Sequence, residues 1–305
     1  MATMSSAAGY QNLPVGNWAP AIYSQKVLKY FRRASVVEAI TNTDYTGEIE
    51  NFGDTVNIIK EPTITVKDYA RGQTVNTENL DDNQIQLTID QGSYFAFKVD
   101  DIEERQSHIN FEALATSSGA YALKKNYDYN VLKYIYDNAV ASTGTLGTQG
   151  TSANTGDEVA NLVSQAAAEL DKNDVPEENR WLVAPPQFYE VLRQAGSKIM
   201  DMSVTGGGAS PLLNGRVTDG KLHGFDLYQS NAIAVGSTGS AATQTFGSSS
   251  TSGQTLILYG HMSGVATASH IAKTEVIRDP DSFSDIVRGL HVYGRKVLRA
   301  ESDTG

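Results

Sequence analysis

The segment at residues 47–72, GEIENFGDTVNIIKEPTITVKDYARG, alternates apolar and polar side chains in two short runs. A polar segment at residues 71–84 follows, after which the alternation resumes and continues as far as Val99. The apolar residues of this pattern are Val56, Ile58, Ile64, Val66, Ile85, Leu87, Ile89, Phe95, Phe97 and Val99. Period-two patterning on both sides of a polar tip predicts a long β-hairpin over residues 47–101.

The predicted hairpin is too long for its tip to pack on its own domain. Its arms take up about 50 residues together, and at about 3.3 Å per residue they reach tens of ångströms. Pro62 in the first arm cannot donate a ladder hydrogen bond, so that arm is expected to be an edge strand or to contain a bulge. We therefore expect the hairpin to project and to contact a neighbouring molecule.

A long amphipathic helix is predicted after the hairpin, over residues 111–140. About 30 residues at 1.5 Å each make a helix about 45 Å long. The predicted apolar face consists of Phe111, Leu114, Ser118, Tyr121, Ala122, Tyr129, Leu132 and Tyr136. These aromatic residues are interpreted as packing residues and not as contacts to a cofactor. Gly119 is expected to weaken the helix by on the order of 1 kcal/mol relative to alanine.

The other predicted elements mix helices and strands without regular alternation, which is typical of an α+β fold. The predicted helices lie at residues 21–33, at 157–172 and from Pro185-Pro186 onward. The predicted strands lie at residues 35–40, 181–184, 225–235, 255–260, 264–270, 273–278 and 289–299, with a turn at 279–281. Low-complexity segments at 142–156 and 236–254 predict flexible loops.

The composition and charge of the chain limit the functions open to it. The formal net charge of -11 argues against a protein that coats a nucleic-acid backbone, but it allows one that encloses nucleic acid. The absence of cysteine excludes disulfides, thiolate metal sites and thiol nucleophiles. Residues 1–14 contain neither a basic n-region nor an apolar h-region, so we expect no signal peptide there. No apolar run approaches the roughly 20 residues that span a bilayer. We expect a soluble protein made in a cytoplasm, with no membrane partner.

Two segments match catalytic motifs only in part. Residues 215–221, GRVTDGK, have the glycine and lysine spacing of a phosphate-binding loop, but Leu222 stands where a magnesium-binding Ser or Thr is needed. Residues 260–264, GHMSG, place the serine one position away from that of a nucleophile elbow. Neither segment supports nucleotide binding or ester hydrolysis.

The titratable residues predict no metal or cofactor site. No two of the histidines have the three- or four-residue spacing of a zinc pair. The acidic cluster at residues 100–104 lacks the pattern of a calcium loop, and we interpret it as a solvated turn or an intersubunit ion-pair patch. A chain with no catalytic constellation, a projecting hairpin and a very long helix is typical of a structural or interaction protein.

Three segments resemble the major capsid proteins of tailed bacteriophages. They are residues 47–72, quoted above, FAFKVDDIEERQS at 95–107, and TEVIRDPDSFSDIVRGLHVYGRKVLRAE at 274–301. The order of the predicted elements is similar to that of the Hong Kong 97-like capsid fold, and the resemblance covers most of the chain. It implies an N-terminal arm at 1–46, an extended hairpin loop at 47–101, a peripheral domain with a spine helix at 102–156, an axial domain at 157–263, and return strands of the peripheral domain at 264–305.

The resemblance implies a structural protein and not an enzyme. Copies would assemble through pentamers and hexamers into the icosahedral shell around the double-stranded DNA genome, which is a partner only by enclosure. A separate scaffolding protein is implied because the chain has no long charged helical prodomain, and a portal protein and a decoration or cement protein are further implied partners. The implied location is the virion, after synthesis in the host bacterial cytoplasm. Two alternatives stay open: an encapsulin-like protein compartment, and an enzyme of unknown type.

Two sets of residues are the candidate contacts in such a shell. The hairpin candidates for subunit contact are Lys67, Tyr69, Arg71, Asp81 and Asp82. The candidates on a basic helix facing the interior are Lys26, Lys29, Arg32 and Arg33. An ordinary solvated helix face is the alternative interpretation of that helix. Some members of the family crosslink through a hairpin lysine, and Lys60 and Lys67 match such a lysine by position alone.

Overall fold

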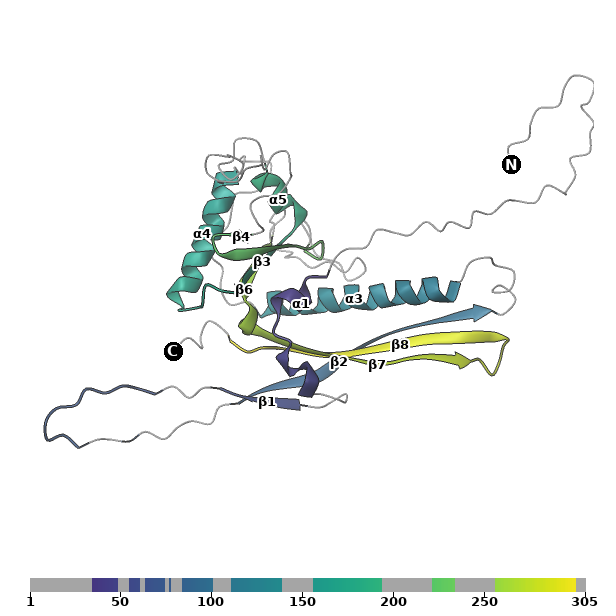
Figure 1. The fold of residues 1–305 in the computed structure, drawn as a ribbon, viewed down its shortest axis with the longest axis horizontal. Helices are drawn as coiled ribbons and strands as arrows, with labels where there is room; N and C mark the ends of the chain where they lie inside the picture. The colour runs from purple at the N-terminus through teal and green to yellow at the C-terminus, as the bar shows by residue number, and fades with distance from the viewer. Residues whose placement is uncertain are drawn as a thin grey trace, which may run out of the picture.

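Two four-stranded sheets organise the fold (Figure 1). The computed structural model describes residues 35–48, 55–60, 64–74, 77, 84–100, 111–138, 156–193, 221–233 and 256–299. The larger sheet has the strand order β1-β2-β8-β7, and the smaller sheet has the order β4-β5-β3-β6. Helices and strands are intermixed along the chain, which confirms the predicted α+β class.

All neighbouring strands of the larger sheet are antiparallel. Its strands are β1 (Thr55–Ile59), β2 (Gln84–Asp100), β7 (Val265–Arg278) and β8 (Ser284–Val297). The sequence predicted two strands where β7 is continuous, because its pairing with β8 carries on through a register shift between Ile271 and Lys273. β8 begins at Ser284 and not at residue 289, because residues 285–294 pair with β2 on one side and with β7 on the other.

The smaller sheet lies against two helices and contains the most buried strand. Its strands are β3 (Arg180–Ala184), β4 (Lys221–Leu222), β5 (Phe225–Gln229) and β6 (Leu258–His261). The helices are α4 (Gly156–Lys172) and α5 (Pro186–Leu192), both close to their predicted positions. β3 is buried on both faces, because Trp181 and Val183 point into one core and Leu182 and Ala184 into another.

One hydrophobic core joins the two sheets. It contains side chains from β3 and β6 of the smaller sheet, from β7 and β8 of the larger sheet, and from the long helix α3 (Phe111–Asp137). The connection between the sheets is short, because β6 leads through the 3-10 turn η3 (Met262–Gly264) directly into β7. Figure 1 shows α3 lying along the larger sheet, with α4 and α5 on the other body of the molecule.

The strand predicted at residues 35–40 is wrong, because Val37–Ile40 form the short helix α1. A carboxylate oxygen of the buried Asp128, on α3, accepts hydrogen bonds from the backbone N–H groups of Val36 and Val37 at 3.1 and 3.2 Å. The Ser35 hydroxyl donates to the same oxygen at 3.1 Å. Two consecutive N–H groups reach one acceptor in a helical turn, whereas a strand directs them to opposite sides. A residue distant in sequence therefore decides this local structure.

The buried face of α3 is rotated from the predicted one by about one residue position, or about 100°. Leu132 is buried as predicted, but Ser118 and Ala122 are exposed. The other apolar residues that α3 buries are Tyr127, Val131 and Ile135. The predicted packing residues Tyr129 and Tyr136 are only partly buried, at the margin of the core. Tyrosine rings lie at such margins because their hydroxyls are polar, so counting them as fully apolar misplaced the face.

Gly119 of α3 has a packing role that the helix propensity scale does not show. The Phe95 ring of β2 lies so close to it that a Cβ atom at position 119 would stand 2.9 Å from the ring. The same ring approaches Gly289 of β8, where a Cβ atom would stand 2.5 Å away. Phe95 and Gly289 are direct cross-strand partners. Two glycines thus provide the space that lets the helix approach the sheet over this ring.

The hairpin prediction is confirmed at its base and wrong farther out. β1 pairs with β2 in antiparallel register from Thr55–Thr88 to Ile59–Gln84. The second half of β2 does not belong to the hairpin, because β2 pairs with β8 from Ile89 to Asp100. Residues 64–74 contain no strand, although Ile64 and Val66 continue the alternation. The described part of this loop projects away from both sheets, at the left of Figure 1.

Candidate functional site

The described residues contain no assembled metal site. No group of three or more His, Asp or Glu side chains comes together among them to hold a metal ion. Within the same residues, no helix is both long and apolar enough to cross a membrane. The serine of the GHMSG segment lies close to a histidine, with 2.7 Å between His261 Nδ1 and Ser263 Oγ. That nitrogen also accepts from the Ser263 N–H at 3.1 Å, so the pair caps the turn η3 between the sheets.

The titratable groups with displaced pKa values belong mainly to the packed core. Burial raises the pKa values of Tyr127 and Tyr293 and lowers that of His291. The three rings pack together between α3 and β8, with centroids 5.0 to 5.5 Å apart: His291 and Tyr293 are stacked, and Tyr127 meets both edge to face. Burial also raises the pKa of Tyr189, whose hydroxyl donates to the Tyr228 carbonyl at 2.8 Å and ties α5 to β5. Such groups in a packed core indicate a structural role.

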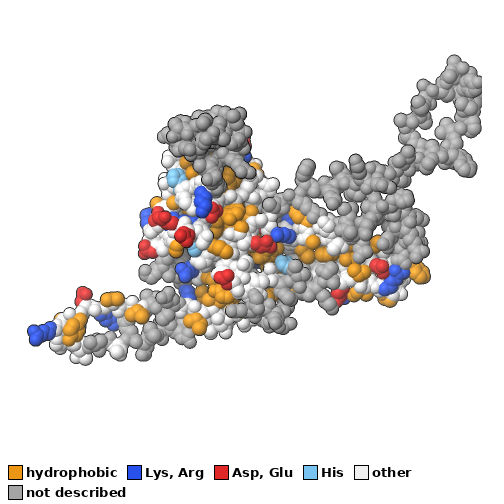
Figure 2. Space-filling model, viewed as in Figure 1, with side chains coloured by type: hydrophobic (Ala, Val, Ile, Leu, Met, Phe, Trp, Pro, Cys, Tyr) orange, Lys and Arg blue, Asp and Glu red, His pale blue; other side chains and the backbone are white. Residues whose placement is uncertain are grey.

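The end of β1 and the projecting loop of the hairpin carry exposed apolar side chains. Ile59 is 76% exposed, Ile64 69%, Val66 92% and Tyr69 68%. We call these four residues the hairpin surface. Figure 2 shows hydrophobic side chains on this projecting segment at the left, next to basic ones. An apolar surface of this kind on a segment away from the core marks an interaction site.

The end of the hairpin loop has a defined turn. The Gln73 N–H donates to the Ala70 carbonyl at 2.9 Å, and the Ala70 N–H donates to the Gln73 side-chain oxygen at 3.1 Å. Gly72 lies inside this turn with a φ of 92°, a left-handed conformation that favours glycine. The loop therefore presents the hairpin surface on a backbone with local order at its end.

The structure places only part of the predicted contact residues. Lys67, Tyr69 and Arg71 lie exposed on the projecting loop, so the hairpin candidates within the described residues occur together. Asp81 and Asp82 lie outside the described residues. The same holds for the predicted basic helix with Lys26, Lys29, Arg32 and Arg33.

A second exposed apolar group, at the turn between β7 and β8, was missed in the sequence. Phe283 is 80% exposed, Val276 56% and Ile277 38%. We call these three residues the sheet tip. The sequence does contain a signal for this group, because Phe283 is a large apolar residue within the polar turn segment DPDSFSD at residues 279–285. Alternation predicts strands on both sides of this turn, and a single apolar residue in a polar turn belongs to no alternating pattern.

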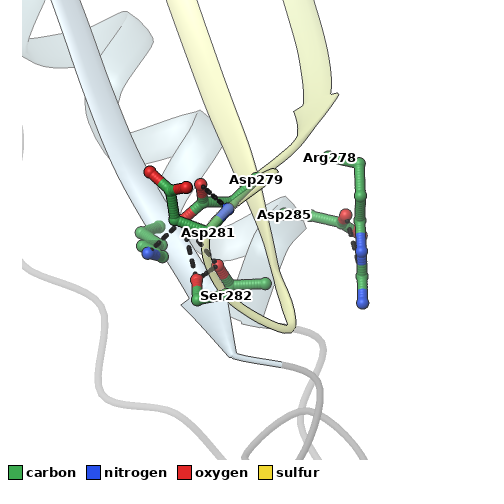
Figure 3. A network of polar contacts seen from close by, with 7 residues as sticks. Arg278, Asp279, Asp281, Ser282 and Asp285 are labelled. Carbon is green, nitrogen blue, oxygen red and sulfur yellow. Dashed lines mark hydrogen bonds and ion pairs between the residues drawn. The ribbon is translucent and has the colours of Figure 1, made fainter.

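Ion pairs across the strands surround the sheet tip. Arg278 Nη1 lies 3.1 Å from Asp285 Oδ1, and Arg288 Nη2 lies 2.6 Å from Glu275 Oε2. Lys98 pairs with Asp279. The Arg278–Asp285 pair (Figure 3) and the Arg288–Glu275 pair are partly exposed, where ion pairs contribute little to stability, so their main consequence is a surface with balanced charge.

The comparisons with known proteins agree with this arrangement. Residues 82–302 match the family model described as phage capsid protein. The structure labelled Mycobacterium phage Che8 is 30% identical, with a TM-score of 0.75 over 93% of this chain and 95% of that chain. The capsid of cyanophage P-SCSP1u is 20% identical, with a TM-score of 0.73 over 93% and 91% of the two chains.

A third structure extends the likeness in fold. The asymmetric unit of the mature capsid of bacteriophage PhiM1 is 16% identical, with a TM-score of 0.68 over 96% of both chains. No curated protein sequence matches the chain. The family model covers well over half of the residues, and the Che8 structure is 30% identical over 93% of this chain. The chain therefore belongs to the phage capsid protein family, as a major capsid protein that forms the shell of a tailed phage.

Proposed function

We propose that copies of this chain assemble through pentamers and hexamers into a closed icosahedral shell, with the hairpin of each subunit lying over its neighbour. The observation that carries this proposal is the hairpin surface. Ile64 and Val66 are exposed on a loop that projects from its own core, and they gain burial only when another molecule covers them. Obligate interfaces between subunits typically bury about 2,000 Å² or more, and a projecting loop adds area of this kind.

The two sheets support the assignment of separate segments of the chain to separate domains of the capsid subunit. The smaller sheet, with α4 and α5, falls within residues 157–263 apart from the first residue of α4, and we assign this segment to the axial domain at the centre of each capsomer. The larger sheet and α3 fall within residues 47–137 and 265–297, which we assign to the hairpin loop and the peripheral domain. Residues 1–46 would form the N-terminal arm. The short link η3 joins the two domains.

The chemistry of the chain supports enclosure of DNA and not a tight coat on it. The net charge of -11 repels a phosphate backbone, so the wall would hold a genome without adhering to it. The further partners proposed are a scaffolding protein, a portal protein and a decoration or cement protein. Synthesis would take place in the cytoplasm of the host bacterium, and the shell would act without catalysis or a cofactor.

The basic helix proposed at residues 21–33 would face the interior of the shell. The charge pattern supports this, because the chain is acidic overall and these residues contain its strongest basic cluster. Trypsin should cut the Lys26–Arg33 segment in unassembled subunits and spare it in intact, filled shells. Rapid cleavage there in intact shells would place the segment outside.

Electron microscopy and sedimentation of the full chain, expressed with its scaffold, test the main proposal. We expect closed shells tens of nanometres across, and filled particles with genome-length DNA from infected cells. Only monomers or dimers under every scaffold and salt condition would contradict the proposal. Shells that hold protein and no DNA in an infection would indicate a protein compartment instead.

A further inference from the structure

A short segment of the chain, residues 35–42, lies where the two sheets meet (Figure 1). We call this segment the clasp. Its apolar side chains Val36, Val37 and Ile40 are 5%, 0% and 0% exposed. They belong to the core that joins the two sheets, together with side chains of α3, of β7 and β8, and of β3 and β6. The clasp is therefore part of the packing between the two domains.

The clasp is held by the chain around it and not by its own sequence. α1 has four residues, too few for a helix that is stable by itself, and no neighbouring side chain caps its N-terminal end. The cap is the Asp128 carboxylate of α3, which accepts from the Val36 and Val37 N–H groups and from the Ser35 hydroxyl. We therefore expect α1 to form only while the clasp is docked on α3.

The other end of the clasp is bonded to the first residues of β7. Asn42 forms a parallel bridge with Ala266. The Asn42 N–H donates to the Val265 carbonyl, and the Asn42 carbonyl accepts from the Thr267 N–H, both at 2.9 Å. The buried hydroxyls of Thr41 and Thr267 lie 2.8 Å apart. Because β7 begins directly after η3, these bonds fix the clasp beside the link between the sheets.

This position lets the clasp restrict the angle between the two domains. Within the described residues, the covalent link between the sheets is η3, a turn of three residues. A few residues between two packed bodies can absorb a change in backbone angles, as hinges do. The clasp is bonded to α3 and β7 on one side of this link, and its apolar side chains share a core with β3 and β6 on the other. Rotation about η3 would pull these side chains out of that core.

We propose that the clasp sets the angle between the axial and peripheral domains and thereby the curvature of each capsomer. This inference rests on the proposed assembly, in which axial domains meet at the centre of a capsomer and peripheral domains at its edge. A narrow range of angles then favours shells of one diameter, whereas a loose joint allows several.

Removal of the distant cap tests the clasp. Asp128→Ala takes away the acceptor of the Val36 and Val37 N–H groups. Deuterium exchange of these two groups should become about tenfold faster or more, as expected for the loss of a buried hydrogen-bond acceptor. In electron micrographs, shells of this variant should lose the uniform diameter of the unmodified shells.

Two further variants bracket this result. Glu38→Gln is the matched control on α1, because it changes only a partly exposed ion pair with Lys124, and it should leave exchange and diameter unchanged. Thr41→Val deletes only the hydroxyl that faces Thr267, and it should give a smaller loss of uniformity. Thr41→Val carries the test if Asp128→Ala does not fold.

A disulfide tests whether docking of the clasp is what sets the diameter. The chain has no cysteine, so Thr41→Cys with Thr267→Cys adds one thiol pair where two hydroxyls are in contact. In the Asp128→Ala chain, the oxidised pair should restore the uniform diameter, and reduction should abolish it again. Each single-cysteine variant, treated in the same way, is the control and should restore nothing.

Spin labels report the angle in unassembled subunits. Glu190 is exposed on α5, and Tyr94 is 77% exposed on β2, so cysteines in their places can carry one label on each domain. The distribution of distances between the two labels should be broader in Asp128→Ala than in the chain with the labels alone.

Four outcomes would overturn the inference and leave the proposed function standing. They are shells of one diameter from the folded clasp variants, an equal change in Glu38→Gln, no recovery with the oxidised pair, and a label distribution of unchanged width. Failure of the unmodified chain to form shells would instead remove the proposed function, and the effect on curvature with it. The label distances would then still decide whether the clasp fixes the angle between the domains.

Discussion

The two arms of the hairpin have the same alternation of apolar and polar residues, but the apolar side chains of one arm are buried and those of the other are exposed. Leu87 and Ile89 in the second arm are 0% and 2% exposed, whereas Ile64 and Val66 in the first arm are 69% and 92% exposed. The buried pair packs against Ala266, Ala268 and Val292 of β7 and β8. Alternation therefore identifies side chains that need burial, but it does not say whether their own chain provides it.

The apolar side chains of the two arms gain burial free energy in different steps, one arm in folding and the other in assembly. Full burial of a Val, Leu or Ile side chain stabilises by about 1.5–3 kcal/mol. Leu87 and Ile89 gain this within the subunit, whereas Ile64 and Val66 gain it only in contact with another molecule. Substitutions in the core should therefore change the unfolding of the subunit, and substitutions in the hairpin loop should change assembly alone.

The largest effect is expected in the core that joins the two sheets. Leu132→Asp places a charge on the fully buried side of α3 and should cost several kcal/mol against a total stability of about 5–15 kcal/mol. We expect insoluble or unfolded protein, measured by circular dichroism and solubility. Ala120→Asp, on the exposed side of the same helix, is the control and should fold normally. A soluble, cooperatively unfolding Leu132→Asp protein would contradict the assigned face.

A smaller effect is expected where the helix meets the sheet over Phe95. Gly289→Ala puts a methyl group against this ring and should cost about 1–3 kcal/mol of unfolding free energy. Phe95→Leu in the same chain should recover part of that loss, because the two residues share one space. Gly264→Ala has open space around its Cβ position and is the control, with an expected change within about 0.5 kcal/mol. Equal stability of the two glycine variants, measured by denaturant unfolding, would show that the ring can move aside.

The sequence predicted the parts of the fold that depend on local periodicity. The base of the hairpin, the long helix, the buried strand at Trp181–Ala184 and the helix that begins after Pro185 were found where the patterns placed them. The parts that depend on distant contacts were not predicted. α1 depends on the Asp128 carboxylate 91 residues away, and the role of Gly119 depends on a ring in another strand.

The candidate contact residues show the same limit. The projecting hairpin loop was predicted because its alternation lies on both sides of a polar tip and extends too far for the tip to pack on its own domain. The sheet tip was missed because a turn of Asp, Pro and Ser is an ordinary turn until the structure shows the exposure of Phe283. Apolar side chains that only another molecule can bury are predictable from the sequence where they recur at a regular spacing. A single side chain of this kind is not predictable in this way.

Acid should weaken the core through the buried ring of His291. Burial lowers the pKa of His291 below its ordinary value of 6.5, so the unfolded chain binds a proton more readily than the folded one. The stability from this neutral ring is present above about pH 6.5 and is lost as the pH falls through that value toward the folded pKa. Thermal unfolding at about pH 7.5 and about pH 5.5 should show the loss, and it should be smaller in His291→Phe. An identical pH dependence in the two proteins would assign the effect to other groups, such as His261, whose pKa is also lowered by burial.

The smallest effect on the subunit, and the sharpest test of the comparison, is expected in the hairpin loop. The double variant Ile64→Ser, Val66→Ser should change the unfolding free energy by no more than about 0.5 kcal/mol, because both side chains are already exposed. Shell formation should nevertheless fall, since the apolar area that would be covered by a neighbour is gone. Leu87→Ser is the matched variant on the buried arm, and it should cost about 2–5 kcal/mol of unfolding free energy. A loss of about 2 kcal/mol or more in the double variant would mean that the loop packs on its own chain, and unchanged shells would mean that no neighbour covers it.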